Sequence, residues 1–296
     1  MNFAIIASKK DIAGMNIVNE LKKLNSTLPI CIVDEETVYS DNLDTERIVL
    51  KSNSRGVQEL KHTANFSPRV LDKDKLTDAD FIIFASRHQS VKKVKTLTVH
   101  AIGNWKKADF GGRDNTACMA SALMLKHFFQ ELNKQAQSAH LDKEYQISLE
   151  ATHHGPFLET PCLFIEVGSS KQEWNDSRAC KVVAKTILSS INSVNKIKNN
   201  KQKISIGIGG PHYCPNFNKI QLDNRNQFAI SHIIAEYALP INKEMIHQAI
   251  LKTKQKVEYV IIDWKGLGKS EQRQQTLDVL KDFNIKVIRT SEAKSE

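Results

Sequence analysis

Phe81-Ile82-Ile83-Phe84-Ala85 is a continuously apolar run bounded by Asp80 and Ser86. Such a short run is typical of a strand that is covered on both faces, as the strands of parallel sheets are. Similar runs on both sides of it predict further strands at Phe3–Ala7, Ile30–Val33, Glu46–Leu50, Thr96–Ile102, Tyr145–His153, Leu163–Val167, Ile204–Ile208, Tyr259–Ile262 and Ile285–Ile288.

Helical patterns separate these runs. Between Asp11 and Leu24, Ile12, Met15, Val18 and Leu21 recur at every third position, as the apolar stripe of a helix requires. Other helices are predicted at Cys118–Gln137, Arg178–Val194, Lys243–Lys252 and Gln272–Phe283. Alternation of strands with helices indicates an α/β fold. We therefore predict a single, open, largely parallel twisted sheet with helices on both faces.

The length of 296 residues allows one large domain or two smaller ones. Because no flexible linker separates the predicted elements, we expect a single catalytic α/β domain over residues 1–296. Residues from about 34 to 79 could form a subdomain or insertion within it.

The chain is basic, with 42 Lys and Arg against 33 Asp and Glu, a net charge of +9 and a sequence pI near 9.2. This excess favours a polyanionic partner, of which RNA is the usual one. From charge alone, a generic basic surface is an equally good interpretation.

Three features indicate a cytoplasmic protein. No apolar run approaches the roughly 18 residues that span a bilayer, so no membrane association is expected. The first residues read as a strand and lack the basic lead of a secretion signal. The cysteines are odd in number and scattered, which favours a reducing compartment; they are Cys31, Cys118, Cys162, Cys180 and Cys214.

The segment Ala151-Thr152-His153-His154-Gly155-Pro156 places two histidines at the end of a predicted strand. Histidine is the side chain best suited to bind a transition metal or to move protons near neutral pH. Neighbouring side chains of a strand face opposite ways, so the two rings share a site only if the backbone turns between them. The alternative is that only His154 is functional and His153 is a core residue.

A second histidine follows Gly209-Gly210-Pro211, where glycines allow a tight turn and a close approach of backbone to a ligand. His212 is the strongest single catalytic candidate, and a structural histidine in a turn is the alternative. Glu166 lies in an apolar strand, where a carboxylate is a metal ligand, a base with raised pKa, an anchor for a histidine or a structural group.

Ser86-Arg87-His88-Gln89-Ser90 follows the run 81–85 at its carboxyl end, where parallel sheets bind ligands. Arg87 could pair with phosphate and His88 could carry protons. His100 lies inside the next predicted strand, before Gly103-Asn104, and a core role is as plausible for it as a catalytic one.

Gly111-Gly112-Arg113 precedes a helix predicted to begin near Thr116, and a glycine turn that leads into a helix N-terminus is a natural anion site. A plain N-cap by Asp114 or Asn115 is the competing interpretation. Asp263 and Lys265 could face one crevice or form a structural ion pair. His232 lies in an apolar, helix-like context, in which a core histidine is the commoner case.

Zinc motifs with strict spacing are absent, so any metal must be held by ligands distant in sequence. There is also no Walker loop, which disfavours nucleotide hydrolysis.

Several motifs in the same order, from about residue 1 to residue 290, resemble the archaeal- and plant-type D-aminoacyl-tRNA deacylases. They are Ser-Arg-His-Gln-Ser at 86–90, His100 with Gly103-Asn104, Ala-Thr-His-His-Gly-Pro at 151–156, Glu166-Val-Gly-Ser-Ser, Gly-Ile-Gly-Gly-Pro-His-Tyr at 207–213, His232-Ile, and Asp263 with Lys265-Gly266. One departure is Ser231, where the family pattern usually has glycine.

The resemblance implies hydrolysis of the ester that joins a D-amino acid to the 3′ end of tRNA, as chirality proofreading in translation. It also implies zinc as cofactor and a fold similar to those of peptidyl-tRNA hydrolases and nucleoside phosphorylases. The expected partner is tRNA carrying a D-amino acid, with no obligate protein partner and a monomeric enzyme.

On this basis we expect the catalytic groups to converge at the carboxyl edge of the sheet; they are His88, His154, His212 and Glu166. Zinc ligands are expected among His153, His154, His212, His232 and Glu166. Substrate is expected to contact Arg87, Asn104, Gly111, Gly112, Arg113, Tyr213 and Lys265, with Trp105 or Tyr213 available to stack a terminal base.

Two rival functions remain at this point. A metal-dependent peptidase or amidohydrolase would act on small molecules and be indifferent to tRNA. A non-catalytic RNA-binding protein would bind tRNA in a salt-sensitive way without cleaving the ester.

Overall fold

The computed structural model describes residues 1–25, 30–33, 58–59, 79–197, 202–223, 225 and 227–294. The predicted strand at Glu46–Leu50 and most of the predicted subdomain at 34–79 lie outside the described residues.

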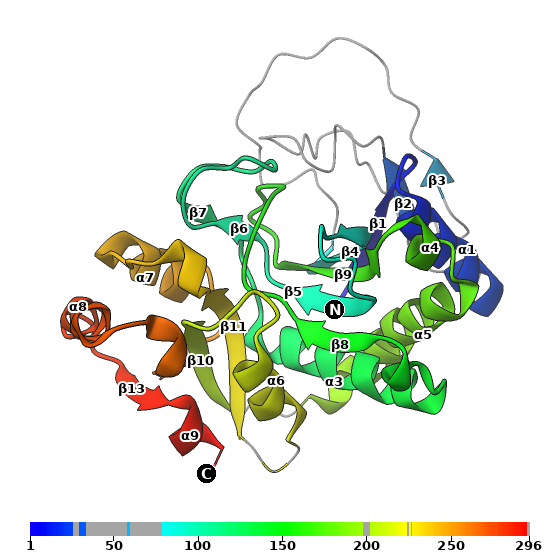
Figure 1. The fold of residues 1–296 in the computed structure, drawn as a ribbon. Coiled ribbons are helices and arrows are strands. Elements are labelled where there is room, and N and C mark those ends of the chain that lie inside the picture. The colour runs from blue at the N-terminus through cyan, green and yellow to red at the C-terminus, as the bar shows by residue number, and fades with distance from the viewer. Residues whose placement is uncertain are drawn as a thin grey trace.

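The first half of the chain forms a seven-stranded sheet of order β3-β2-β1-β4-β9-β5-β8 (Figure 1). Its strands are β1 (Phe3–Ser8), β2 (Ile30–Val33), β3 (Gln58–Glu59), β4 (Phe81–Gln89), β5 (Thr96–His100), β8 (Gln146–Leu149) and β9 (Cys162–Ser169). Five of them run parallel, whereas β5 pairs antiparallel with β9 and parallel with β8. The predicted run 81–85 is central in this sheet.

The second half forms a four-stranded parallel sheet of order β11-β10-β12-β13. Its strands are β10 (Lys203–Ile208), β11 (Phe228–Ile234), β12 (Tyr259–Ile262) and β13 (Lys286–Arg289). A small sheet of β6 (Gly103–Asn104) and β7 (Thr116–Ala117) lies apart from both.

The predicted α/β class with mostly parallel strands and flanking helices is confirmed, but the strands form two main sheets. The division lies just beyond β8. There the Ala151 N–H donates to the His212 carbonyl (2.9 Å) and the Thr152 N–H to the Ile233 carbonyl (3.0 Å). The chain after β8 therefore joins the first sheet to the second without continuing a regular strand.

Helices cover one face of the first sheet and both faces of the second (Figure 1). The largest core lies between the first sheet and three helices, α1 (Ile12–Leu24), α3 (Ala122–Ser138) and α5 (Ser177–Ser193). Helix α3 also packs on β11, and the opposite face of the second sheet is covered by α7 (Lys243–Leu251) and α8 (Ser270–Leu280). The remaining helices are α4 (Lys171–Trp174), α6 (Pro215–Leu222) and α9 (Thr290–Ala293).

Several predicted boundaries are corrected by the structure. Helix α3 begins at Ala122, because the Ser121 side chain accepts the Met124 N–H and caps it there. Strand β7 lies before this cap, so the Gly111-Gly112 turn does not lead into a helix N-terminus. Strand β4 continues to Gln89, which places His88 inside the strand. The helix-like context of His232 is wrong, since this residue lies in β11.

Among the described residues, no helix is both long and apolar enough to cross a bilayer. The four cysteines at 118, 162, 180 and 214 are buried and free.

Lys126 on α3 is a buried cation, and it yields a stability prediction. Its side chain is 7% exposed, and burial lowers its pKa from 10.5 to about 8 in spite of the charge of Asp223. Between these two values the unfolded chain binds more protons than the folded chain, so the free energy of unfolding increases as pH rises through that window. Below about pH 8 the lysine is charged in the folded chain, and this gain in stability is lost.

The K126M variant lacks this titration. We expect its free energy of unfolding, relative to that of the wild type, to be larger at pH 7 than at pH 10.5, by up to about 3 kcal/mol, so the variant is relatively more stable at pH 7. Urea unfolding of both proteins at the two pH values measures this difference. A constant difference between the proteins would contradict the lowered pKa of Lys126.

Candidate active site

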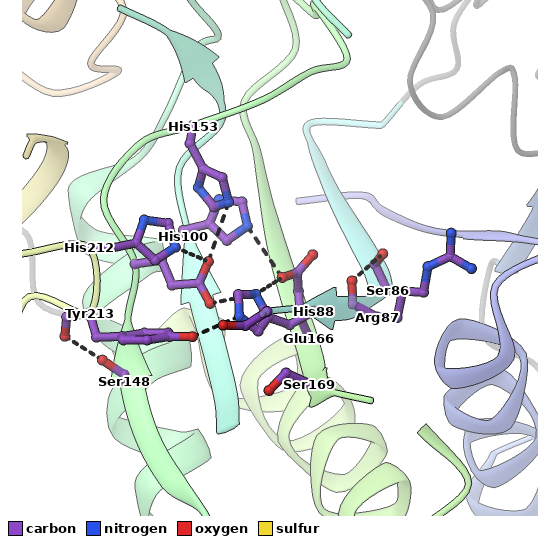
Figure 2. Close-up of polar contacts among 12 residues, drawn as sticks. Ser86, Arg87, His88, His100, Ser148, His153, Glu166, Ser169, His212 and Tyr213 are labelled. Carbon is purple, nitrogen blue, oxygen red and sulfur yellow. Dashed lines mark hydrogen bonds and ion pairs between the residues drawn. The ribbon is translucent and has the colours of Figure 1, made fainter. Parts of the chain in front are cut away.

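One face of the first sheet carries a polar cluster where the helices do not cover it. His88 on β4, His100 on β5 and Glu166 on β9 lie on this face (Figure 2). Their strand neighbours Ile165 and Val167 point to the opposite face, into the core beneath α3 and α5. The alternation of a strand therefore separates the site from the main core.

Glu150 lies at the centre of the cluster. Its Oε1 is 3.1 Å from Nδ1 of His88, and its Oε2 is 3.2 Å from Nε2 of His212 and 3.4 Å from Nε2 of His153. The residue is only 2% exposed and follows β8 directly. One buried carboxylate thus contacts three imidazoles that come from distant parts of the chain.

The backbone turns between His153 and His154, because His154 adopts a positive φ of 45°. Both rings consequently approach His100, with centroids at 4.3 Å for His153 and 4.9 Å for His154. The backbone turn that a shared site requires is therefore present. The expectation that a regular strand places the two rings on opposite faces is wrong.

His212 reaches the cluster from the second sheet. It follows β10 through Gly209 (φ 89°) and Gly210 (φ 80°), and a Cβ on Gly210 would lie 2.8 Å from Oδ2 of Asp263. Only glycine fits this turn without strain. The His212 side chain is 30% exposed, which connects the buried carboxylate with solvent.

Two tyrosines contact the outer nitrogens of two of the three imidazoles that lie on Glu150, those of His88 and His212. The hydroxyl of Tyr213 is 2.9 Å from Nε2 of His88, and the hydroxyl of Tyr237 is 3.1 Å from Nδ1 of His212. Each imidazole is therefore fixed between a tyrosine and the same carboxylate, which sets the orientation of both rings.

The contacts between carboxylates and imidazoles decide which groups of the cluster are charged. Burial lowers the pKa of His88, but the hydrogen bond with Glu166 and the charge of Glu150 outweigh it and raise the pKa to about 9. Burial raises the pKa of Glu166, yet its hydrogen bonds with His100 and His88 bring that pKa below the usual value. Burial and the positive charge of His100 lower the pKa of His154 to about 4.

Three imidazoles of the cluster use the same ring atom in a hydrogen bond with the backbone. Nδ1 of His100, His153 and His154 each lies within 3.0 Å of a backbone carbonyl, and since a carbonyl only accepts, each Nδ1 donates. In the neutral form of each ring, Nε2 then carries the lone pair that can bind a metal. The described residues that could hold a metal form three overlapping groups: His100 with His153 and His154, Glu150 with His153 and His212, and His88 with Glu150 and Glu166.

A loop from the small sheet supports His154. The Asn104 side chain donates to the Gly111 carbonyl (2.8 Å), and a Cβ on Gly112 would lie 3.0 Å from Cα of Gly155. Gly111 and Gly112 thus pack backbone to backbone against Gly155, next to His154. Their observed contacts are structural, while Arg113 remains exposed at the end of the turn.

The structure brings His88, His153, His154, His212, Tyr213 and Glu166 together as predicted, but it does not bring in three other predicted residues. The guanidinium of Arg87 lies over Trp174, 5.4 Å from the ring centroid, and points away from the cluster (Figure 2). His232 lies in the core, where its nitrogens contact the Thr152 hydroxyl and the Lys252 carbonyl. Lys265 is exposed after β12, outside the contacts of the cluster in the described part of the chain.

The prediction that Trp105 could stack a base is also corrected. Its ring is 5% exposed and its indole N–H donates to the Ile233 carbonyl. Conversely, sequence reasoning missed Glu150 and Tyr237 and left His100 undecided. A usable signal for Glu150 was a carboxylate three residues before His153, the one charged residue between Tyr145 and Thr152.

The arrangement suits hydrolysis of an acyl bond. Ionised carboxylates and oriented imidazoles can accept a proton from water and return it to a leaving group. The same nitrogens and oxygens are the donor types that zinc prefers.

Comparisons with known proteins agree with this chemistry. A family model described as D-aminoacyl-tRNA deacylase matches residues 75–288. A D-aminoacyl-tRNA deacylase of Pyrococcus furiosus is 34% identical over 96% of this chain and 98% of the relative. That of Methanocaldococcus jannaschii is 31% identical over 92% and 94%.

A solved crystal structure of a conserved protein of unknown function has the same fold as this chain. It is 25% identical, with a TM-score of 0.79 over 100% of this chain and 97% of that protein. With the family model and the named relatives, the motif resemblance is confirmed, and the chain belongs to the D-aminoacyl-tRNA deacylase family of hydrolases.

Proposed function

We propose that this protein hydrolyses the ester bond of D-aminoacyl-tRNA and releases the free D-amino acid and tRNA. The observation that supports this proposal most directly is the contact of three imidazoles with the buried carboxylate of Glu150, with His212 partly exposed to solvent. The names of the relatives supply the substrate class, and the basic charge of the chain suits tRNA.

We further propose zinc as the cofactor, because the donor atoms fit it. Nε2 of His100 and Oε1 of Glu150 are buried and form no aligned hydrogen bond among the described residues, although they face Oε2 of Glu166 at 3.8 Å and Nδ1 of His88 at 3.1 Å. His100 with His153 and His154 forms one candidate ligand set, which leaves His212 free to move protons, and Glu150 with His153 and His212 forms the alternative set. When bound, zinc polarises a carbonyl and lowers the pKa of a water.

In this proposal the chain's own residues move the protons. His212 takes a proton from the attacking water, stabilised by Glu150, and returns it to the departing 3′ oxygen of the ribose. The cationic His88, held by Tyr213 and Glu166, stabilises negative charge that develops on the ester. Glu166 keeps His88 and His100 in place.

We also propose that the chain is one catalytic domain, acting as a monomer in the cytoplasm. Support for one domain comes from α3, which packs against strands of both main sheets. Support for the compartment comes from the proposed substrate, since aminoacyl-tRNA is used in translation.

The test offers the purified protein tRNA charged with the D- or the L-form of one amino acid, with and without added zinc. We expect rapid release of the D-amino acid only, loss of activity on thorough chelation, and recovery with zinc. Activity that survives chelation would contradict the zinc proposal.

The same experiment separates the rival functions. Cleavage of free peptides or amides, with no preference for tRNA, would indicate a metal-dependent peptidase or amidohydrolase. Salt-sensitive tRNA binding without ester cleavage would indicate a non-catalytic RNA-binding protein.

A further inference from the structure

We propose that a surface next to His154, formed by Phe110, Arg113, Phe157 and Lys252, holds the single-stranded 3′ end of tRNA. We call this surface the basic-aromatic patch. The inference rests on the proposed function and deepens it, since it assigns the residues that bind the end of the substrate.

The patch adjoins the catalytic cluster through the backbone. The carbonyl of Phe110 accepts the N–H of Gly155 at 3.1 Å, and Gly155 directly follows His154. The Phe110 side chain is nevertheless 75% exposed, the most exposed aromatic ring of the described residues. Stacking of another ring on Phe110 would bury this exposed apolar surface, which is favourable.

Two cations lie on a second ring of the patch. The guanidinium of Arg113 is 4.1 Å and the Nζ of Lys252 is 5.4 Å from the centroid of Phe157, which is 6% exposed. The two positive charges therefore lie no more than 9.5 Å apart around one buried ring, where like charges repel each other. A bound anion would remove this repulsion.

In the described part of the chain, the acidic side chains nearest in sequence to the patch are exposed. Glu159 is 60% exposed and its Oε1 lies 4.0 Å from Nζ of Lys252. Asp114 accepts the backbone N–H of Ala108, and Asp109 is exposed on the same loop. Beyond Lys252, the exposed Lys254 and Lys256 continue the positive charge along the chain.

An exposed ring on the same turn as a cation is an arrangement that binds single-stranded nucleic acid, where bases stack on aromatics and phosphates meet Arg or Lys. The scissile ester lies on the ribose of the terminal nucleotide, so that nucleotide must lie beside the catalytic cluster. We assign Phe110 as the platform for a terminal base, and Arg113 with Lys252 as the phosphate contacts. Trp105 and Tyr213 cannot serve as this platform, because one is buried and the other binds His88.

The charges are tested with the variant R113Q/K252Q, measured on intact tRNA and on tRNA trimmed of its 3′-terminal CCA. We expect intact tRNA to bind about tenfold more weakly, with a salt slope smaller by about 0.7 for each phosphate that the variant no longer neutralises. Trimmed tRNA should bind the variant and the wild type equally.

Two matched controls accompany this variant. R113K/K252R preserves both charges and should bind intact tRNA as the wild type does. K181Q/K185Q removes two exposed charges from α5, on the far side of the first sheet, and should affect intact and trimmed tRNA alike.

The platform is tested with F110L and F110W on the same two RNAs. We expect F110L to weaken binding of intact tRNA on the order of tenfold, and F110W to preserve it, because only an aromatic face stacks a base. A tRNA with 2-aminopurine as its terminal base should lose fluorescence on binding to the wild type and to F110W, but not to F110L.

Equal losses on intact and trimmed tRNA, or unchanged quenching by F110L, would overturn the patch while leaving the proposed function in place. Failure of the wild type to cleave D-aminoacyl-tRNA would instead overturn the proposed function, and with it the purpose of the patch.

Discussion

The E150Q variant is expected to lower kcat for D-aminoacyl-tRNA deacylation by about 10²- to 10³-fold. Glutamine keeps the shape of Glu150 but removes the charge that faces His88, His153 and His212. Without this charge the imidazoles lose the group that orients them and stabilises their protonated forms. Single-turnover deacylation at saturating enzyme measures the chemical step directly.

The matched control for this variant is E271Q, an exposed glutamate in the first turn of α8 that should cleave at the wild-type rate. Circular dichroism and thermal unfolding show whether E150Q keeps its fold. A folded E150Q that cleaves as fast as E271Q would contradict the central role of this carboxylate.

The H212A variant should also lose activity by about 10²- to 10³-fold with its fold intact. His212 is the most exposed of the three imidazoles on Glu150, at 30%, and it occupies a turn whose conformation is set by Gly209 and Gly210. Its removal takes away the proposed proton carrier without opening the core. Rates with D-aminoacyl-tRNA over a range of pH measure the loss.

The Y237F variant is a milder change at the same histidine. It removes only the hydroxyl that contacts Nδ1 of His212 at 3.1 Å, so we expect a loss on the order of tenfold. Turnover by H212A close to that of Y237F would show that His212 does not carry the proton.

Much of the fold could be predicted from local patterns. Short apolar runs gave strands such as β12 within a residue of their observed ends, and the threefold spacing in α1 gave a helix. The division into two sheets could not be predicted, because it depends on bonds from Ala151 and Thr152 to residues far along the chain. Strand β11 was missed because Ile230-Ser231-His232-Ile233-Ile234 fits either period.

The site was predictable where a histidine follows glycine or precedes it at a strand end, as at His154 and His212. Arg87 was misplaced because the strand was expected to end at Ala85; in a longer strand, alternation puts Arg87 and His88 on opposite faces. The roles of Glu150 and His100 could not be assigned from the sequence, since they follow from the turn at His154 and from the pairing of β5 with β9.

The most direct test of one shared catalytic unit compares single-turnover deacylation by E150Q, H212A and the double variant E150Q/H212A. If both groups act together, the double variant should be about as slow as the slower single variant, because residues of one unit are strongly non-additive. If the two losses multiply instead, Glu150 and His212 act independently, and a hydrolytic centre built on this carboxylate is contradicted.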